Sequence, residues 1–167
     1  MDKETHFLHL IEENKGILFK ISRVYQDGPE DRNDLLQEMT LQLWLAFDSF
    51  RAESKFTSWM YRVALNTAIA FFKKQKRRPD SEKLPDDFER LEEQSPAKEK
   101  EEQLAVFYRA IQQLNKVEKA LIYLYMEDIA YEEIASNLGI SEVNVRVRLN
   151  RVKNKLKEII KKMNYEY

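Results

Sequence analysis

Residues 131–157 constrain the fold of this chain more than any other stretch, because they carry the pattern of two helices joined by a tight turn. Ile134 and Leu138 are spaced one turn apart on the inner face of the first helix. Gly139 follows, and glycine ends helices because it adopts a positive φ without a Cβ clash. Ser141 is a suitable N-cap for the second helix. The stretch therefore predicts a helix-turn-helix.

The second helix of this motif combines an apolar stripe with a basic, polar face. Apolar residues recur at Val145, Leu149, Val152 and Leu156, a spacing that predicts inward packing. The opposite face carries Val143, Arg146, Val147, Asn150, Arg151 and Asn154. Arginine and asparagine hydrogen-bond base edges in the DNA major groove, and valine contacts the thymine methyl group. We expect DNA contact here, and the alternative is an ordinary solvated helix whose basic end complements the helix dipole.

The whole chain is poor in helix breakers. It has three Gly and four Pro among 167 residues, so we expect an all-α protein, with helices at 101–114 and 117–126 supporting the helix-turn-helix. It has no Cys, which excludes a disulfide framework and a thiolate metal site and fits a reducing compartment. Without a membrane-spanning apolar run or a signal peptide, we expect a soluble, cytoplasmic protein.

The net charge of −1 conceals a strong segregation of sign. Residues 73–78 hold five basic and no acidic side chains, and residues 146–167 hold eight basic and two acidic ones. Between them, residues 79–104 hold ten acidic and four basic side chains, together with prolines and few apolar residues. Two basic patches suggest two nucleic-acid contacts. We therefore expect two small helical domains, 1–78 and 105–167, joined by a flexible acidic linker.

The N-terminal segment 5–25 is expected to be a core helix that ends before Gly28 and Pro29. Its core positions are predicted to be Leu8, Ile11, Leu18, Ile21 and Tyr25. His6 and His9 lie near two glutamates, but a metal site in a helical bundle draws its ligands from several helices. Since the sequence has no second cluster containing His, we expect no metal.

The segment 34–50 has apolar residues on more than one face of its expected helix. The positions that suit the core are Leu35, Leu36, Met39, Leu43, Ala46 and Phe47. Leu41 and Leu45 point elsewhere, among polar side chains. This arrangement indicates either a protein contact or a helix that is buried on two sides.

A loop at 51–56 precedes a third helix, for which Thr57 or Ser58 is the expected N-cap. One stripe of this helix carries Trp59, Arg62, Asn66, Lys73 and Arg77. An aromatic ring, an amide and cations together suit an unpaired base and its phosphates. The alternative is that the aromatic residues Trp59, Tyr61, Phe71 and Phe72 are core, which we expect for Phe71 and Phe72.

These segments together resemble the extracytoplasmic-function (ECF) sigma factors of bacterial RNA polymerase, a group of the sigma-70 family. The resemblance rests on WMYRVALN at 59–66, preceded by DSFRAESKFTS, with DLLQEMTLQLW upstream and YEEIASNLGIS and VRVRLNRVK downstream. It covers nearly the whole chain apart from the acidic tract. It implies an N-terminal domain that binds the polymerase clamp and the promoter −10 element, and a C-terminal domain that binds the −35 element.

The resemblance also assigns residues to three surfaces. The clamp would meet Asp34, Gln37, Glu38, Leu41 and Leu45. The −10 element would meet Arg51, Lys55, Phe56, Trp59, Arg62, Asn66, Lys73 and Arg77, with the loop and Asn66 holding a flipped base. The −35 element would meet Ser141, Val143, Asn144, Arg146, Val147, Asn150 and Arg151. The linker would pass the polymerase active centre toward the RNA exit path. The implied partners are core RNA polymerase, promoter DNA and an anti-sigma factor, with no cofactor and no small-molecule substrate.

Two other classes of function compete with this one. A conventional helix-turn-helix transcriptional regulator accounts for 131–157 and leaves the stripe at 59–77 without a role. A helical enzyme would need a nucleophile with a base, a carboxylate–histidine cluster or a glycine-rich phosphate loop, and the sequence has none of these. We therefore expect no catalytic residue.

Overall fold

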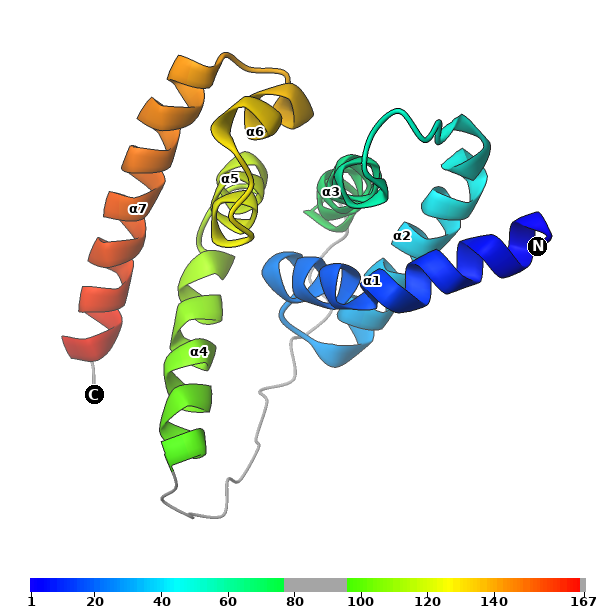
Figure 1. Ribbon diagram of the computed structural model, residues 1–167. Coiled ribbons are helices and arrows are strands. Elements are labelled where there is room, and N and C mark those ends of the chain that lie inside the picture. Colours follow the sequence, from blue (N-terminus) through cyan, green and yellow to red (C-terminus); the bar gives the residue numbers. More distant parts are fainter. Residues whose placement is uncertain (77–95, 166–167) are drawn as a thin grey trace.

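The computed structural model describes residues 1–76 and 96–165, and for residues 73–76, 96, 164 and 165 it describes the backbone alone. Within these ranges the chain is helical and contains no strand (Figure 1), so the predicted all-α class is confirmed. The helices are α1 (Lys3–Tyr25), α2 (Pro29–Ala46), α3 (Phe56–Lys76), α4 (Pro96–Gln112), α5 (Lys116–Met126), α6 (Tyr131–Leu138) and α7 (Glu142–Tyr165), with a 3-10 turn, η1, at Phe47–Ser49.

Helices α1, α2 and α3 form the N-terminal half, with every pair of them in contact (Figure 1). Ala64 and Ala68 of α3 are fully buried, and these small side chains let the neighbouring helices approach closely. The prediction that Leu8 belongs to the core is wrong, because Leu8 is 56% exposed and Phe7 is buried instead. Phe7 shares one helix face with Leu18, whereas Leu8 points about 100° away from it.

Two helix starts differ from the sequence prediction because of their first residues. Helix α2 begins at Pro29, five residues before the expected Asp34, since proline at the first helical position has a suitable φ and needs no N–H partner. Helix α3 begins at Phe56, so Thr57 and Ser58 lie in its first turn and do not form the N-cap. The ring of Phe56 packs against neighbouring aromatic rings, which places this residue inside the helix.

Helix α4 begins at Pro96, before the expected start at residue 101. Residues 96–104, which the sequence analysis assigned to the flexible linker, are therefore helical. Their alanine, lysine and glutamate residues are good helix formers, and this propensity outweighs the high charge. The remainder of the expected linker, 79–95, lies outside the described residues, as does Arg77.

Helices α4 to α7 form the C-terminal half, in which α7 packs against the other three. Gly139 ends α6 with a φ of 67°, and the Ser141 hydroxyl accepts a hydrogen bond of 3.1 Å from the Asn144 N–H. Both predicted caps are thus confirmed. Val145 and Leu149, two members of the predicted apolar stripe, are buried on the inner face of α7.

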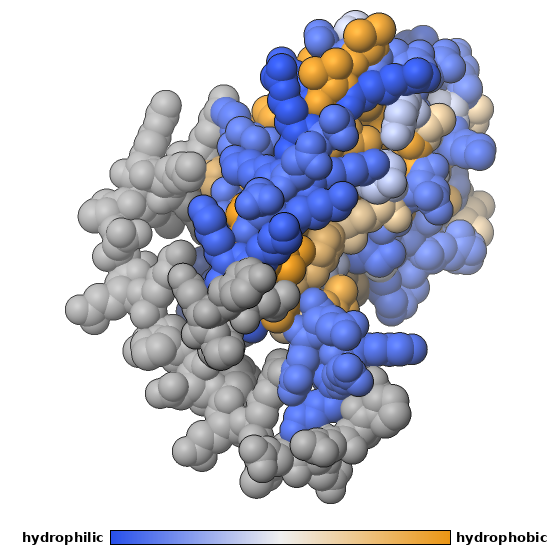
Figure 2. All heavy atoms as spheres, turned by 90° about the vertical axis from the view of Figure 1, so that its left-hand side faces the viewer, coloured by the Kyte–Doolittle hydropathy of each residue, from blue (hydrophilic) through white to orange (hydrophobic). Residues whose placement is uncertain are grey.

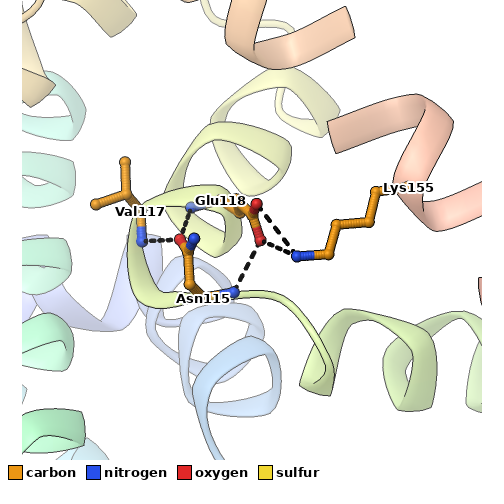
Figure 3. A network of polar contacts seen from close by, with 4 residues as sticks. All are labelled: Asn115, Val117, Glu118 and Lys155. Carbon is orange, nitrogen blue, oxygen red and sulfur yellow. Dashed lines mark hydrogen bonds and ion pairs between the residues drawn. The ribbon is translucent and has the colours of Figure 1, made fainter. Parts of the chain in front are cut away.

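A polar network fixes the start of α5 and connects it to α7 (Figure 3). The Asn115 carboxamide oxygen accepts from the N–H groups of Val117 and Glu118, and the Glu118 carboxylate accepts from the Asn115 N–H at 2.9 Å. Lys155 of α7 then pairs with the Glu118 carboxylate at 3.0 Å. The cap contributes about 1 kcal/mol, and the exposed ion pair less. The cap therefore fixes the start of α5, and the ion pair adds one polar contact to the apolar packing of α7 on α5.

The two halves are in contact through α1 and α3 on one side and α4 and α5 on the other (Figure 1). The Tyr25 hydroxyl donates to the Lys116 carbonyl at 2.7 Å, and the Gln112 amide donates to the carbonyls of Arg23 and Val24 at 3.0 Å. Burial strongly raises the pKa of Tyr25. The buried side chains of the two halves also form one continuous cluster.

Candidate nucleic-acid and polymerase interfaces

The exposed face of α7 and the turn before it carry every residue that was predicted to contact the −35 element. Val143 is 70% exposed and Val147 is 43% exposed. The other predicted side chains on this surface, all of them exposed, are Ser141, Asn144, Arg146, Asn150 and Arg151. Figure 2 shows this side of the molecule as largely hydrophilic, with an apolar group at the end where α7 begins. Cations and amides therefore surround two accessible valines, as a major-groove contact requires.

Arg146, one of the residues predicted to contact the −35 element, has contacts within the helix-turn-helix. Its Nη2 atom lies 3.3 Å from Glu142 Oε1, and its guanidinium lies over the Tyr131 ring, 5.6 Å from the ring centre. These partners come from the first turn of α7 and from α6, so the helix-turn-helix itself orients the guanidinium. Arg148, which the sequence analysis missed, is exposed on the flank of the same face. Arg148 lies four residues after Asn144, and this spacing indicates that the two side chains are neighbours on one side of the helix.

The stripe on α3 is accessible at its centre. Arg62 and Asn66 are exposed and lie one turn apart. Trp59 is half-buried, and its ring lies 5.4 Å from Phe50 and 5.5 Å from Phe56. This aromatic cluster anchors both ends of the loop at 51–55, where Arg51 and Lys55 are exposed. The side chain of Lys73 is not described. Phe71 and Phe72 pack against the core as predicted.

The N-terminal part of α3 also contacts the C-terminal half, through Arg62 of the stripe and through the neighbouring Tyr61. Arg62 Nη2 lies 3.4 Å from the Ser136 hydroxyl of α6, and the Tyr61 hydroxyl donates to Glu127 at 3.4 Å. Burial raises the pKa of Tyr61 to about 12, and the Glu127 carboxylate adds to this shift. These contacts could not be predicted from the sequence, because the partners lie 66 and 74 positions apart and no local pattern links them.

An apolar groove between α1 and α2 lies on a different surface of the N-terminal half. Leu41 is 48% exposed and Leu45 is 64% exposed, so the alternative of a helix buried on two sides is wrong. The groove has a volume of about 700 Å³ and is lined by Glu4, Phe7, Leu8, Leu36, Gln37, Thr40, Leu41 and Trp44. On the α2 wall, Gln37 and Leu41 were predicted from the sequence to lie at a contact surface, whereas Leu36 was expected in the core. Asp34 is exposed on the same helix but does not line the groove. The α1 wall was not predicted, because Leu8 was placed in the core.

The histidines of α1 contact a glutamate and an aromatic ring. His9 lies 3.2 Å from Glu13 on the same helix, and the His6 ring packs edge-on against Phe47. Among the described residues, no group of three or more His, Cys, Asp or Glu side chains could hold a metal ion. Nor does any described helix have the length and apolar character that crossing a membrane requires.

The fold and its surfaces define a helical DNA-binding protein with a C-terminal helix-turn-helix and a second polar stripe on α3. The family model described as Sigma-70 region 2 matches residues 10–78, and the one described as Sigma-70, region 4 matches residues 104–156. The chain belongs to the sigma-70 family of RNA polymerase sigma factors, in its ECF group. This membership decides between the two DNA-binding classes in favour of a sigma factor, which directs RNA polymerase to promoters.

Curated relatives match along nearly the whole chain. The RNA polymerase sigma-H factor of Pseudomonas aeruginosa is 31% identical over 163 residues, which cover 91% of this chain and 84% of the relative. The ECF RNA polymerase sigma-E factor of Escherichia coli strain K12 is 28% identical over 176 residues, covering 96% and 91%.

Two solved structures share the fold. CnrH in complex with the cytosolic domain of CnrY has a TM-score of 0.67 at 20% identity, with 95% of this chain and 90% of CnrH covered. The sigma factor RpoE in complex with the anti-sigma factor NepR, from Bartonella quintana, has a TM-score of 0.69 at 19% identity, with 93% and 97% covered.

Proposed function

We propose that the three surfaces divide the work of promoter recognition between the two halves of the chain. The N-terminal half, residues 1–78, binds core polymerase and the −10 element, and the C-terminal half, which begins with α4 at Pro96, reads the −35 element. The observation that carries this proposal is the exposure of two separate nucleic-acid surfaces, Arg62 and Asn66 on α3 and the polar face of α7.

Core polymerase binds, in this proposal, at the α2 surface formed by Asp34, Gln37, Glu38, Leu41 and Leu45. Exposed apolar side chains within a polar ring are typical of a protein contact. The rim carries carboxylates, so the matching surface is apolar at its centre and basic around it. The sigma-70 resemblance supports the polymerase clamp as that partner.

The unpaired strand of the −10 element binds along α3 and the preceding loop. The Asn66 amide offers a donor and an acceptor to the edge of an extruded base. Arg62, with Arg51 and Lys55 from the loop, supplies positive charge to phosphates. The aromatic cluster around Trp59 gives the loop a rigid base, and its half-exposed ring offers a stacking surface.

The −35 element is read as a duplex by α7. Arg146, Asn150 and Arg151 hydrogen-bond base edges in the major groove, while Val143 and Val147 contact thymine methyl groups. Ser141 and Asn144, at the start of the helix, lie where helix N–H groups approach a phosphate. Arg148 adds a flanking phosphate contact.

The chain acts without catalysis of its own, in the cytoplasm where bacterial polymerase works. CnrH and RpoE, which share its fold, were solved with the cytosolic domain of CnrY and the anti-sigma factor NepR. We extend this to an anti-sigma factor that restrains the present chain.

Promoter mapping tests the division of work. Core polymerase is supplied with the purified chain and sheared genomic DNA of the source bacterium, and the 5′ ends of the transcripts are sequenced. We expect transcription start sites that share a −35 and a −10 element and that disappear when the chain is left out. Arg151→Ala should change the sequence preference at the −35 element alone. A changed preference at the −10 element instead would contradict the assignment of α7.

A further inference from the structure

A further basic residue of α7 lies outside the set that was predicted to contact the −35 element. Lys153 follows Arg146 by seven positions, which are almost two full turns of the helix, so both side chains point to the same flank of α7. The two residues are about 10 Å apart along the helix axis. In a helix-turn-helix, the residues near the start of the second helix contact base edges. Lys153 therefore lies farther than Arg146 from the end of α7 that reads bases.

Each of these two cations lies over a tyrosine ring from another helix. The Nζ atom of Lys153 is 3.8 Å from the ring centre of Tyr125, in the last turn of α5. The guanidinium of Arg146 is 5.6 Å from the ring centre of Tyr131, the first residue of α6. Both α5 and α6 contact α7 (Figure 1). Two consecutive helices thus present one aromatic ring each to the same flank of α7.

The pair of Lys153 and Tyr125 is accessible and keeps its positive charge. Tyr125 is 38% exposed, and Lys153 is half-buried. Among the residues that the structure describes, no carboxylate is paired with Lys153. Lys155 differs in this respect, because its ammonium lies 3.0 Å from the Glu118 carboxylate. An aromatic face attracts a cation without neutralising it, so the full charge of Lys153 is available to an anion.

The ring of Tyr125 also lowers the entropic cost of binding an anion. A lysine side chain has many rotamers and loses this freedom when its ammonium is fixed on a phosphate. Contact with the ring restricts the Lys153 side chain before any ligand arrives. The ammonium has three N–H donors, so it can face the ring on one side and a phosphate oxygen on the other.

We propose that Lys153 binds a backbone phosphate of the −35 duplex and that Tyr125 is a positioning residue for this contact. Arg146 reads a base edge near the start of α7, and Lys153 contacts the DNA backbone that borders the groove. The end of α5 thereby becomes part of the DNA-binding surface, next to the helix-turn-helix. This inference rests on the proposed role of α7 at the −35 element.

Salt dependence tests the phosphate contact. Fluorescence anisotropy at several salt concentrations measures binding of the full-length chain to a mapped −35 duplex and to a duplex of scrambled sequence. Lys153→Gln should weaken binding to both duplexes by the same factor, because phosphates are common to every sequence. It should also reduce the slope of log K against log salt concentration by about 1. An unchanged slope would overturn the phosphate contact.

The matched control for this measurement is Lys100→Gln. It removes the same charge from an exposed position near the start of α4, away from the helix-turn-helix (Figure 1). The control should leave the slope unchanged, and an equal decrease in the control would overturn the phosphate contact, because the slope would then follow net charge alone. A parent chain without preference for the mapped duplex would instead contradict the −35 role of α7, and the slope would still decide the phosphate contact.

A double-mutant cycle tests the positioning role. Tyr125→Leu removes the ring face and should weaken duplex binding about two- to fivefold, the magnitude of an exposed cation–π contact. Tyr125→Phe keeps the ring and should restore most of that binding. When Tyr125→Leu is combined with Lys153→Gln, it should add almost no further loss. Thermal melting confirms that each variant is folded. Additive losses, or a loss in Tyr125→Phe equal to that in Tyr125→Leu, would overturn the positioning role.

Discussion

Individual side chains on α7 differ in what they offer to DNA. The arginines offer charge and hydrogen bonds, whereas Val147 offers a methyl surface alone, with 43% of its area in contact with solvent. Its contribution to binding is therefore separable from electrostatics, which dominates affinity and varies with salt.

Val147→Ala should weaken binding to a mapped −35 duplex by roughly 1 kcal/mol, because it removes methyl groups that contact a thymine methyl. Replacing that thymine with uracil should have a similar effect, and combining the two changes should add little. Fluorescence anisotropy at fixed salt measures all four combinations. Full additivity of the two losses would show that the valine does not contact this methyl.

Tyr61 makes stability sensitive to alkaline pH. Its pKa is about 12 in the folded chain, against an ordinary value of 10, because burial and the Glu127 carboxylate disfavour the phenolate. The unfolded chain therefore loses this proton first, and the stability that neutral Tyr61 contributes is complete below pH 10 and lost as the pH rises through 12. Urea unfolding measures the free energy of unfolding of the parent chain and of Tyr61→Phe. Between pH 10 and 12 this free energy should fall more for the parent than for Tyr61→Phe. A constant difference would contradict the assignment.

The helices illustrate which local signals a sequence carries. Gly139 and Ser141 determine their caps through their own chemistry, so the helix-turn-helix was predictable residue by residue. The prolines at 29 and 96 misled the prediction of α2 and α4, since proline breaks a helix interior but favours its first position. On α1, Leu8 and Phe7 are both apolar, and only packing against α2 distinguishes the groove residue from the core residue.

Helix α2 serves the core and the proposed clamp contact with different residues. Leu41→Glu combined with Leu45→Glu should leave helicity and melting nearly unchanged, because both side chains are already exposed, and should abolish association with core polymerase. Leu43→Ala on the same helix should cost about 2–5 kcal/mol of folding stability, because Leu43 is fully buried. Circular dichroism and co-migration with core polymerase on gel filtration measure the two effects. If the double glutamate variant still bound core polymerase, the polymerase contact would lie on another surface of the chain.

At the scale of the whole molecule, the contact between the halves is the feature that the sequence did not indicate. Periodicity and caps act over a few residues, whereas Tyr25 and Lys116, which share a hydrogen bond, are separated by 91 positions. The exposure of the two proposed nucleic-acid surfaces was predictable, because charge and amides are visible in the sequence. Their relative position was not predictable, because it depends on a buried cluster and on hydrogen bonds that join residues far apart in the sequence.

The central claim is that α3 and α7 act on different parts of one promoter, and permanganate footprinting on a mapped promoter tests it most directly. Holoenzymes with Asn66→Ala or Arg151→Ala are compared for thymine reactivity in the −10 region and for binding to an upstream duplex fragment. We predict that Asn66→Ala reduces melting, by about 1–3 kcal/mol for one lost base contact, and leaves duplex binding intact. Arg151→Ala should weaken duplex binding and leave the melted-strand contact itself intact. If Asn66→Ala melted the promoter as fully as the parent chain, α3 would not hold the flipped base and the account would be contradicted.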